Sequence, residues 1–471
     1  MRGWLDRRIG LDVLLRVALD EPIPGGARLA YIFGSGLLFV FLSQIITGVF
    51  LALYYVPSAD HAHTTVAYIT KSVTAGSFLR SLHSYGSSAM VVVLLLHLSQ
   101  TYIYGAYKKR RELLWVSGCV LFGLVMAMAF TGYLLPWDQR AYFATAVGTN
   151  AVSEVPFIGE SLKRVMRGGT EMGTLTISRF FVAHVFLVPA LIFAFVASHI
   201  FVFRKAGAAG PFAGDGEDLK RKTEPFYPRQ VLMDLSLTAL LIIGLGCLAF
   251  FFPVHLGKAA DPADAQYIPR PEWYYLPIFQ WLKYWHGAAS IVGVLIIPTL
   301  FALAVVAVPF LDRGTERRPW KRPIAMGAYI FVLGSLITLG LRSHYEDHGD
   351  PGVALQLAKQ QAEEEEYTRK PFEPELSAAT LAAANVALAD PLAAKGKGLF
   401  EAQSCNACHG DSGVGTAAAP ALIGVGGKFS ADQISELLKH PNAKMIAGGM
   451  PAVDLPADDL KALVAYVASL K

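Results

Sequence analysis

Seven long apolar runs, separated by shorter polar connections, set the pattern of the chain. Each run is close to the length of about 20 residues that an α-helix needs to cross a bilayer. The pattern predicts membrane helices over Leu29–Tyr55, Arg80–Tyr104, Leu114–Leu135, Ser178–Phe203, Val231–Phe252, Ser290–Phe310 and Ile324–Leu341. Composition agrees, because 54% of the residues are hydrophobic and 17% are charged, whereas soluble domains carry about 25% charged residues. We therefore expect an all-α, polytopic helical bundle in a lipid bilayer.

Lysine and arginine cluster in alternate connections between these runs. Seven spans place every cluster on one side of the membrane, and the positive-inside rule makes that side cytoplasmic. The N-terminus is then cytoplasmic, and the chain beyond the seventh span lies outside. Residues 1–28 mix charges and lack a signal-peptide cleavage pattern, so we expect an amphipathic segment on the cytoplasmic surface. The clusters are Arg2, Arg7 and Arg8; Lys108–Arg111; Arg204, Lys205, Lys220–Lys222 and Arg229; and Arg313, Arg317, Arg318, Lys321 and Arg322.

The last part of the chain has the composition of a soluble module on a linker. Residues 343–390 are acidic and contain no apolar span, which predicts a tether. The module at 391–471 contains the sequence CNACH, in which Cys405 and Cys408 precede His409. This C-x-x-C-H pattern is the attachment signature of a c-type haem, with the thiols on the porphyrin and the histidine on the iron. A chance match and a zinc site are the alternatives, but zinc would need two further ligands.

The sixth ligand of that iron is expected from the second half of the module. Met450 lies in a Gly-Gly-Met-Pro sequence ahead of a final amphipathic helix, an arrangement that resembles the small single-haem cytochromes c. Met445 and His440 are the alternatives. Haem is attached in this way outside the cytoplasm, which agrees with the topology that the basic clusters predict.

Four histidines lie in the second and fourth predicted spans. His83 and His97 are 14 residues apart, a spacing that returns to nearly the same helix face about 21 Å further along the axis. His184 and His199 are 15 apart. Imidazoles in a membrane are costly without partners, and two pairs, His83 with His184 and His97 with His199, would each hold the iron of one non-covalent b-type haem. Satisfied core histidines or a proton path would explain any one of them.

Two glycine pairs accompany the histidines. Gly34 and Gly48 lie in the first span and Gly118 and Gly132 in the third, each pair 14 residues apart. Glycine leaves room for a flat macrocycle beside the backbone, although small residues at helix contacts would explain the pairs equally well. Arg80, one turn before the first histidine, is a candidate partner for a haem propionate, and the alternative is a surface arginine.

These residues together resemble the cytochrome b subunit of the cytochrome bc complexes, the quinol–cytochrome c oxidoreductases. The likeness covers roughly residues 5–345, and its details are closest to the plastid and cyanobacterial branch. That branch has separate four-helix and three-helix chains, which here correspond to fused domains at 29–212 and 213–342. Ile32 stands where that branch attaches an extra haem, so we expect no covalent haem there. The likeness rests on the histidines, GYLLPWDQ at 132–139, KKRRELLWVSG at 108–118, FRKAGAAGPF at 203–212 and PEWYYLPIFQ at 271–280.

The resemblance implies a quinol-oxidation pocket on the outer side, formed in part by Pro271, Glu272, Trp273 and Tyr274. Glu272 would accept a proton from the quinol, and Tyr274 would line the pocket. An interfacial aromatic belt is the alternative interpretation of this tetrapeptide.

The resemblance also implies a second quinone pocket on the cytoplasmic side, near the haem held by His199. The candidates there are Arg229 and Asp234, although surface charges at a helix entrance would look the same.

The predicted function is that of the core subunit of a proton-translocating quinol:cytochrome c oxidoreductase in a bacterial inner membrane, with the c module in the periplasm. One electron from quinol would pass to a Rieske iron–sulfur protein and the other across the membrane. Outside CNACH the sequence contains two cysteines, Cys119 and Cys247, so a Rieske cluster requires a separate subunit. We also expect a cytochrome c acceptor, a homodimeric complex and no nucleic-acid partner. The alternative is a membrane-anchored module that connects the quinone pool to the c haem without bifurcation.

Overall fold

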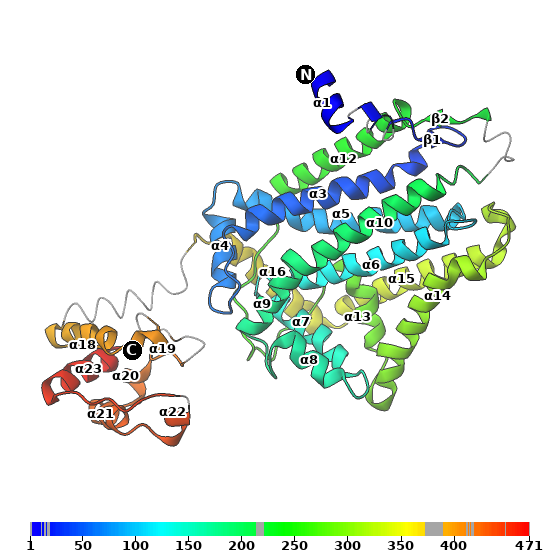
Figure 1. Cartoon of the computed structure of the whole chain (residues 1–471). Coiled ribbons are helices and arrows are strands. Elements are labelled where there is room, and N and C mark those ends of the chain that lie inside the picture. Colours follow the sequence, from blue (N-terminus) through cyan, green and yellow to red (C-terminus); the bar gives the residue numbers. More distant parts are fainter. Residues whose placement is uncertain are drawn as a thin grey trace. The chain divides into compact units, whose positions relative to one another are not determined.

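The computed structural model of the protein describes residues 2–10, 12–13, 16, 19–212, 221–372, 390–410, 413, 415, 419–447 and 449–470. The chain divides into two compact units, Met1–Lys370 and Pro371–Lys471. Both units are built almost entirely of helices (Figure 1). The strands of the described residues are β1 (Pro22–Ile23) and β2 (Glu224–Pro225), which pair antiparallel. The all-α prediction is therefore confirmed.

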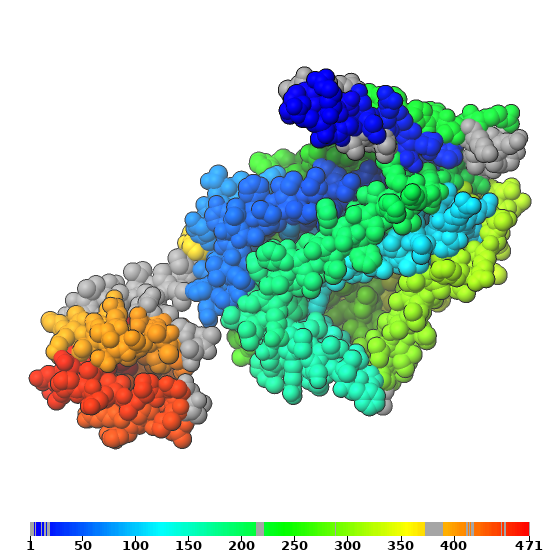
Figure 2. Space-filling model, in the orientation of Figure 1, coloured from blue at the N-terminus to red at the C-terminus, as the bar shows by residue number. Residues whose placement is uncertain are grey.

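Seven helices in the described part of the chain are long and apolar enough to cross a membrane, as predicted. They run along one another as a bundle (Figure 1), and α3 and α10 extend along the face shown in Figure 2. The spanning helices are α3 (Phe33–Ala52), α5 (Gly76–Ile103), α6 (Glu112–Tyr133), α9 (Thr174–Val182) continued by η2 (Ala183–Leu187) and α10 (Val188–Ala206), α12 (Arg229–Phe251), η5 (Val292–Ile296) continued by α14 (Ile297–Leu311), and α15 (Pro323–Gly349).

The fourth span contains a π-helical turn, η2, at the position of His184. Pro189 has no backbone N–H and so cannot form the usual bond to the carbonyl four residues back. The N–H of Val188 bonds to the carbonyl of Ala183, five residues back, and one extra residue enters the turn. At about 100° per residue, this extra residue offsets the spacing of 15 between His184 and His199. The pair therefore keeps the rotational phase of the 14-residue pair on α5.

The seventh span continues past the end of its apolar run, to Gly349. The added turns are polar, and their side chains are paired with neighbouring segments. Asp347 forms an ion pair with Arg270, and Glu346 accepts a hydrogen bond from the side-chain amide of Gln280 at 3.0 Å. The helix is longer than the predicted apolar run because these pairs stabilise polar turns that a hydropathy pattern does not detect.

Short helices cover both ends of the bundle (Figure 1). We refer to the end at which the seventh span finishes as the outer end, because the predicted topology places it outside the cytoplasm. The opposite, inner end carries α1 (Arg2–Ile9), η1 (Leu29–Tyr31), η6 (Pro319–Lys321) and the two strands. The outer end carries α4 (Ala62–Lys71), α7 (Gln139–Ser153), α8 (Gly159–Arg167), η3 (Trp273–Tyr275), α13 (Leu276–Leu282), η4 (Gly287–Ala289) and α16 (Pro351–Arg369).

Buried charges join the connections at the inner end. Lys108 Nζ lies 2.6 Å from Asp312 Oδ1, and the lysine side chain is 3% exposed. Arg322 Nη1 lies 3.1 Å from the other oxygen of the same carboxylate, and the Tyr107 hydroxyl donates to it at 2.7 Å. These residues of the predicted basic clusters therefore link the four-helix and three-helix parts of the chain to each other.

The segment predicted as an acidic tether begins with structured helix. The carboxylate of Asp350 accepts hydrogen bonds from the backbone N–H groups of Gly352 at 2.8 Å and Val353 at 3.2 Å, as the N-cap of a helix does. Helix α16 follows and packs against α15. Residues 373–389 of the predicted tether lie outside the described residues.

The second unit is a small helical module whose first and last helices cross. At the crossing, a Cβ atom on Gly396 would overlap the backbone carbonyl of Ala462, so glycine allows the close approach. The helices are α18 (Pro391–Ala402), α19 (Cys405–His409), α20 (Val425–Lys428), α21 (Ala431–Lys439), α22 (Ala443–Ala447) and α23 (Ala457–Ser469). The buried core consists of Phe400, Ile434, Leu460, Leu463, Val464, Tyr466, Val467 and Leu470.

Candidate functional site

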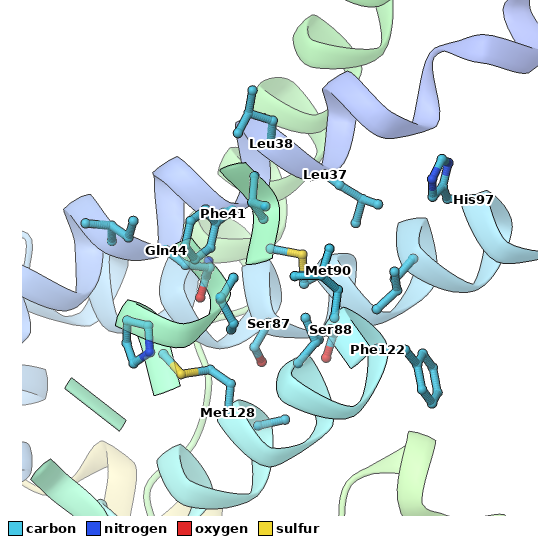
Figure 3. A pocket seen from close by; sticks show the side chains of 18 of the residues that line it. Leu37, Leu38, Phe41, Gln44, Ser87, Ser88, Met90, His97, Phe122 and Met128 are labelled. Atoms are coloured by element: carbon cyan, nitrogen blue, oxygen red, sulfur yellow. The ribbon is translucent and has the colours of Figure 1, made fainter. Parts of the chain in front are cut away.

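A cavity of about 1110 Å³ lies inside the first unit, between α3, α5, α6 and the helix that contains η2 and α10. An ordinary pocket for one small ligand has a volume of about 300–1,000 Å³. The lining between the two levels of histidines is largely apolar and includes Phe41, Met90 and Phe122 (Figure 3). The cavity is lined by all of the histidines and glycines that the sequence singled out in the membrane: His83, His97, His184, His199, Gly34, Gly48, Gly118 and Gly132.

His83 and His184 face each other across this cavity. Their ring centres are 6.2 Å apart, and the ring planes make an angle of 79°. A metal ion bound to one nitrogen of each ring would hold those nitrogens about 4 Å apart, since metal–imidazole bonds are about 2 Å long. The two half-rings account for the rest of the distance, so the pair has the separation needed for one iron. His97 and His199 line the same cavity.

Three of the four imidazoles are oriented by hydrogen bonds at Nδ1. Nδ1 of His83 lies 2.9 Å from the Thr47 hydroxyl, and Nδ1 of His199 lies 2.8 Å from the Ser117 hydroxyl. Nδ1 of His184 lies 3.0 Å from the carbonyl oxygen of Met128. A partner on one ring nitrogen fixes the tautomer and leaves the other nitrogen, Nε2, to bind a metal.

Sequence reasoning missed these orienting residues, although the chain carries a signal for them. Three of the four singled-out glycines directly follow a hydroxyl residue, in the pairs Thr47-Gly48, Ser117-Gly118 and Thr131-Gly132. The third hydroxyl lies 3.4 Å from Nδ1 of His184. A helix that presents a glycine to one edge of an imidazole can thus present the preceding hydroxyl to its Nδ1.

Each singled-out glycine lies against one imidazole ring. A Cβ atom on Gly132 would overlap the ring of His184, and one on Gly48 would lie 3.2 Å from Cε1 of His83. Glycine at these positions therefore lets each ring lie close to the neighbouring helix. A Cβ atom on Gly34 would lie 3.8 Å from Cε1 of His97, and one on Gly118 would lie 3.5 Å from Cε1 of His199.

The residues around this cavity fit haem. Paired imidazoles are suitable axial ligands for haem iron, and the hydrogen bonds at Nδ1 orient the rings for that role. The glycines keep the helix backbones close to the rings, and the largely apolar lining suits a porphyrin.

Arg80 lies on the wall of the cavity, but its guanidinium is already bonded to protein. It donates to the carbonyl oxygens of Val254 and His255, at 2.8 Å each. These bonds attach the second span to the outer loop that follows α12. The arginine thus has a role within the protein, and its predicted bond to a haem propionate remains a prediction.

The predicted quinol-oxidation residues lie at the outer end, where η3 begins. Glu272 and Tyr274 line the same cavity as the histidines. Burial raises the pKa of the Tyr274 hydroxyl, and the neighbouring Glu272 carboxylate raises it further. Trp273 is 46% exposed, and its indole N–H lies 3.4 Å from the Ser88 hydroxyl. Among the described residues that line the cavity are Glu272 and Tyr274, but neither Pro271 nor Trp273.

A charged group next to Glu272 was not predicted from the sequence. Asp138 and Arg140 line the cavity beside it. Asp138 belongs to the PWDQ sequence, and Arg140 directly follows that sequence. Burial lowers the pKa of Arg140, but the surrounding Tyr133, Glu272 and Glu364 outweigh this effect and raise it above the ordinary arginine value. The guanidinium therefore stays charged among several acidic groups.

The two residues predicted for the inner quinone site are separated by the structure. Asp234 is buried, lines the cavity and accepts a hydrogen bond from Gln230 Nε2 at 2.9 Å. Arg229 is exposed and lies 3.3 Å from Glu224 in an ion pair. Gln230, which also accepts the backbone N–H of Arg28 at 2.9 Å, is the additional polar residue at this end.

The CNACH sequence of the second unit forms α19. Nδ1 of His409 lies 2.9 Å from the carbonyl oxygen of Pro420, which leaves Nε2 for iron. Cys405 is half-buried and Cys408 is exposed, so the two thiols differ in their access to solvent. Met450 follows α22, in the loop before α23. These residues fit a c-type haem, with the methionine as the predicted second axial ligand.

Comparisons with known proteins support this interpretation of both units. Family models described as "Cytochrome b/b6/petB", "Cytochrome b(C-terminal)/b6/petD" and "Cytochrome c" match residues 18–207, 259–355 and 393–471. The fold also resembles a chain of a solved structure titled "Hyperthermophilic respiratory Complex III", with a TM-score of 0.67 and 24% identity, covering 78% of this chain and 97% of that one.

Curated relatives show the same relationship over most of the membrane unit. The cytochrome bc complex cytochrome b subunit of Chlorobaculum thiosulfatiphilum is 34% identical over 351 residues, 73% of this chain and 81% of the relative. The menaquinol:cytochrome c reductase cytochrome b subunit of Geobacillus thermodenitrificans is 38% identical over 216 residues, 44% of this chain and 96% of the relative. Cytochrome b/c1 of Bradyrhizobium diazoefficiens is 32% identical over 346 residues, 72% of this chain. The match spans 49%, or about half, of that relative's length.

The fold and the histidine-lined cavity define a membrane-spanning cytochrome of the helical-bundle class. The chain belongs to the cytochrome b family of the bc complexes and carries a cytochrome c domain at its C-terminal end. The family resemblance predicted from the sequence is therefore confirmed.

Proposed function

We propose that the protein is the di-haem core subunit of a quinol:cytochrome c oxidoreductase that moves protons across a bacterial inner membrane. One observation carries the proposal: the cavity lined by the four histidines also reaches Glu272 and Tyr274 at its outer end. The axial ligands and the candidate quinol pocket therefore share one internal space. Relatives named as bc complex and menaquinol:cytochrome c reductase subunits support the same reaction class.

The proposed cofactors are two b-type haems and one c-type haem, which supply one-electron transfer when bound. Arg80, on the cavity wall, is the proposed partner of a haem propionate. The proposed ligand sets are His83 with His184, His97 with His199, and His409 with Met450, with covalent attachment at Cys405 and Cys408.

The proposed reaction at the outer end removes two electrons and two protons from a quinol. Glu272 accepts one of these protons from a quinol hydroxyl, and Tyr274 lines the pocket. One electron leaves to a Rieske iron–sulfur protein on a separate subunit, and the other crosses toward the inner end. A quinone is reduced there beside Asp234, which reaches the cavity, whereas Arg229 is exposed at the surface.

The proposed orientation places the N-terminus in the cytoplasm and the cytochrome c domain in the periplasm. There Cys405, Cys408 and His409 would hold the c-type haem, which would supply electron exchange with the Rieske protein or with a soluble or membrane-bound cytochrome c acceptor. We propose that the complex is a homodimer.

Haem content tests the ligand sets. We expect two b haems for each c haem in the purified complex, measured by pyridine haemochrome spectra. His97→Leu should reduce the ratio to one, while His286→Leu, which changes an exposed histidine of an outer connection, should leave it unchanged. A parent ratio other than two to one would refute the assignment.

The same preparation tests the complex. A Rieske-type electron paramagnetic resonance signal should copurify with the chain, and quinol should reduce a cytochrome c acceptor. Quinol-dependent reduction without that signal would instead favour the module that works without bifurcation.

A further inference from the structure

Helix α16 lies against the outer loop between α12 and η3, and one of its faces holds that loop in place. The side-chain amide of Gln360 bonds both backbone groups of Ile268, accepting the N–H at 3.0 Å and donating to the carbonyl at 3.2 Å. The Thr368 hydroxyl bonds both backbone groups of Leu256, at 2.9 and 3.2 Å. Gln356 donates to another carbonyl of the loop at 3.2 Å. The helix is therefore docked through specific polar contacts.

Glu364 occupies the middle of this docking face. Positions 356, 360, 364 and 368 are spaced by four residues and so lie above one another on a helix. Of the four glutamates at 363–366, Glu364 is the one in line with Gln356, Gln360 and Thr368. Its three neighbours form ion pairs: Glu363 with Lys258 of the outer loop at 2.9 Å, Glu365 with Arg369 at 3.3 Å and Glu366 with Lys370 at 2.7 Å.

Glu364 reaches the back of the cavity wall. A Cβ atom on Gly257 would lie 3.4 Å from Cγ of Glu364 and 3.5 Å from Cβ of Asp138. The N–H of Gly257 donates to the Asp138 carboxylate at 3.3 Å. Asp138, Arg140 and Glu272 line the cavity, whereas Glu364 is partly exposed and is absent from the described lining. Glu364 therefore stands behind these wall residues and also reaches solvent.

The groups that surround Glu364 come from four elements besides its own helix. Glu364 and Glu272 both interact electrostatically with the Arg140 guanidinium, so one cation lies among several acids. The groups that interact electrostatically with Glu364 are Asp138 and Arg140 at the start of α7, Glu272 before η3, and Tyr267 in the outer loop. His63 on α4 bonds to the carbonyl of Gly257, His63 and Lys71 contact the ring of Tyr367 on α16, and Lys258 pairs with Glu363.

We propose that Glu364 is the proton-exit residue of the outer quinol site. It takes the proton that Glu272 has received from the quinol and passes it to the outer solvent. This inference rests on the proposed function of the site. The O–H bond of the Glu272 carboxyl breaks and one forms on the Glu364 carboxylate; water then takes the proton, so no electron is transferred in the step. Glu364 acts through Glu272 and does not contact the quinol.

The electrostatics of Glu364 suit this role. Burial raises the pKa of its carboxyl, Arg140 lowers it, and Asp138 and Glu272 raise it, with a net increase over the ordinary glutamate value. A carboxyl that holds a proton at higher pH than usual can receive one from Glu272 and still lose it to solvent. The carboxylate must be unprotonated to accept, so parent turnover rises as pH rises through the pKa of Glu364.

The test is steady-state turnover of the purified complex with quinol and a cytochrome c acceptor, measured across pH. Glu364→Gln should lower turnover at neutral pH about tenfold, less than the roughly 100- to 10,000-fold loss expected for a group that transfers a proton at the substrate, because water provides a slower route. The rise of turnover with pH should also disappear. Glu364→Asp should recover at least half of the parent turnover, and redox-induced infrared difference spectra should lose one carboxyl protonation signal in Glu364→Gln.

Two control variants separate proton exit from docking. Glu365→Gln changes a half-buried neighbour that is paired with Arg369 within its own helix and should match the parent at every pH. Gln360→Ala loosens the docked helix but keeps the carboxylate, so it should retain the rise with pH. Glu364→Gln overturns the inference if its pH profile and infrared spectrum match those of Glu365→Gln, or if Gln360→Ala reproduces all of its effects. Absence of quinol-dependent reduction in the parent complex would refute the proposed function itself.

Discussion

The hydroxyl of Thr47 lies 2.9 Å from Nδ1 of His83 and donates to the carbonyl of Ser43 at 2.8 Å. Because the hydroxyl hydrogen is used in the second bond, the oxygen accepts the N–H of the imidazole. The first span thus sets the tautomer of a ring on the second span. Nδ1 carries the proton, and Nε2 is left free of hydrogen and able to bind a metal.

Replacing this hydroxyl should weaken haem binding without changing the ligands. For Thr47→Val we expect haem affinity at the outer level to fall by about 10–100-fold, the usual effect of losing a hydrogen-bond partner of a metal-binding histidine. The measurement is b-haem retention on dilution. Ser236→Ala, which removes a hydroxyl bonded to Leu232 within its own helix, should retain haem as the parent does. Equal retention in both variants would contradict the assigned role of Thr47.

An added methyl group should have opposite effects at two of the glycines of α6, Gly132 and Gly123. Gly132→Ala should displace the His184 ring and remove one b haem, because the added Cβ overlaps the imidazole. Gly123→Ala meets no atom within 4 Å and should keep both b haems, with helix stability raised by up to about 1 kcal/mol. Haem ratios and thermal unfolding of the two variants provide the comparison. Full haem content in Gly132→Ala would contradict the close approach of ring and helix.

Removing the acidic group of the proposed quinol pocket should slow turnover selectively. Glu272→Gln should reduce quinol:cytochrome c turnover by about 100-fold, since it removes the proposed proton acceptor, while both haem types remain at parent levels. Stopped-flow reduction of the b haems by quinol measures the effect directly. Turnover equal to that of the parent would show that another group accepts the proton.

The buried charges at the inner end should make the membrane unit sensitive to acid. Burial raises the pKa of Asp312, but Lys108 and Tyr107 outweigh this effect and lower it below the ordinary aspartate value. A lowered folded-state pKa contributes stability above the unfolded value of about 4, and that contribution is lost as pH falls through the folded-state pKa. Thermal unfolding in detergent should therefore show a loss below about pH 4.

Asp312→Asn should remove this acid-sensitive contribution and destabilise the unit at neutral pH. Two almost completely buried cations, Lys108 and Arg322, would lose their carboxylate, a change that costs about 3–5 kcal/mol. Glu316→Gln, at an accessible carboxylate of the same connection that lies 3.0 Å from Arg318, should have a much smaller effect. Similar unfolding temperatures in Asp312→Asn and the parent would rule out a stabilising role.

The helix crossing in the cytochrome c domain offers a matched pair on α18. Gly396→Ala should destabilise the domain by about 1–3 kcal/mol or more, as overpacking does, because the obstacle is the backbone of Ala462. Gly398→Ala meets no atom within 4 Å and should leave stability unchanged or slightly higher. Denaturant unfolding of the full chain, followed at the c-haem absorbance, distinguishes them. Equal midpoints would contradict the crossing geometry.

The membrane helices and the histidine cavity could be predicted because their signals are periodic within single helices. The spacing of His83 and His97 follows from one helix repeat, and the apolar runs follow from bilayer thickness. The π-turn before Pro189 could not be predicted in this way, because a spacing of 15 is compatible with an ordinary helix that is slightly out of phase.

Contacts between segments that lie far apart in the chain could not be predicted from the sequence. Glu364 is one of four consecutive glutamates, and nothing in that run distinguishes the residue that faces Gly257, 107 positions earlier, from those that face solvent. Arg140 follows a recognisable sequence, but its acidic neighbours arrive from other elements. Arg229 and Asp234 look equivalent in sequence, and the rotation of α12 separates them.

The extra residue in the π-turn has a consequence for comparing chains of different length. One backbone insertion near His184 changes the sequence spacing to His199 without changing the direction in which the two rings point. Deleting one residue from Ala183–Leu187 would convert the π-turn into an ordinary α-helical turn and leave His184 facing His83. Deleting one residue from the regular helix α10 before His199 would instead rotate the preceding segment by about 100° and turn His184 away from His83, with every side chain of the ligand set still present. Equivalent histidines in related chains must therefore be matched by rotational phase, and a one-residue gap placed at this turn restores the alignment.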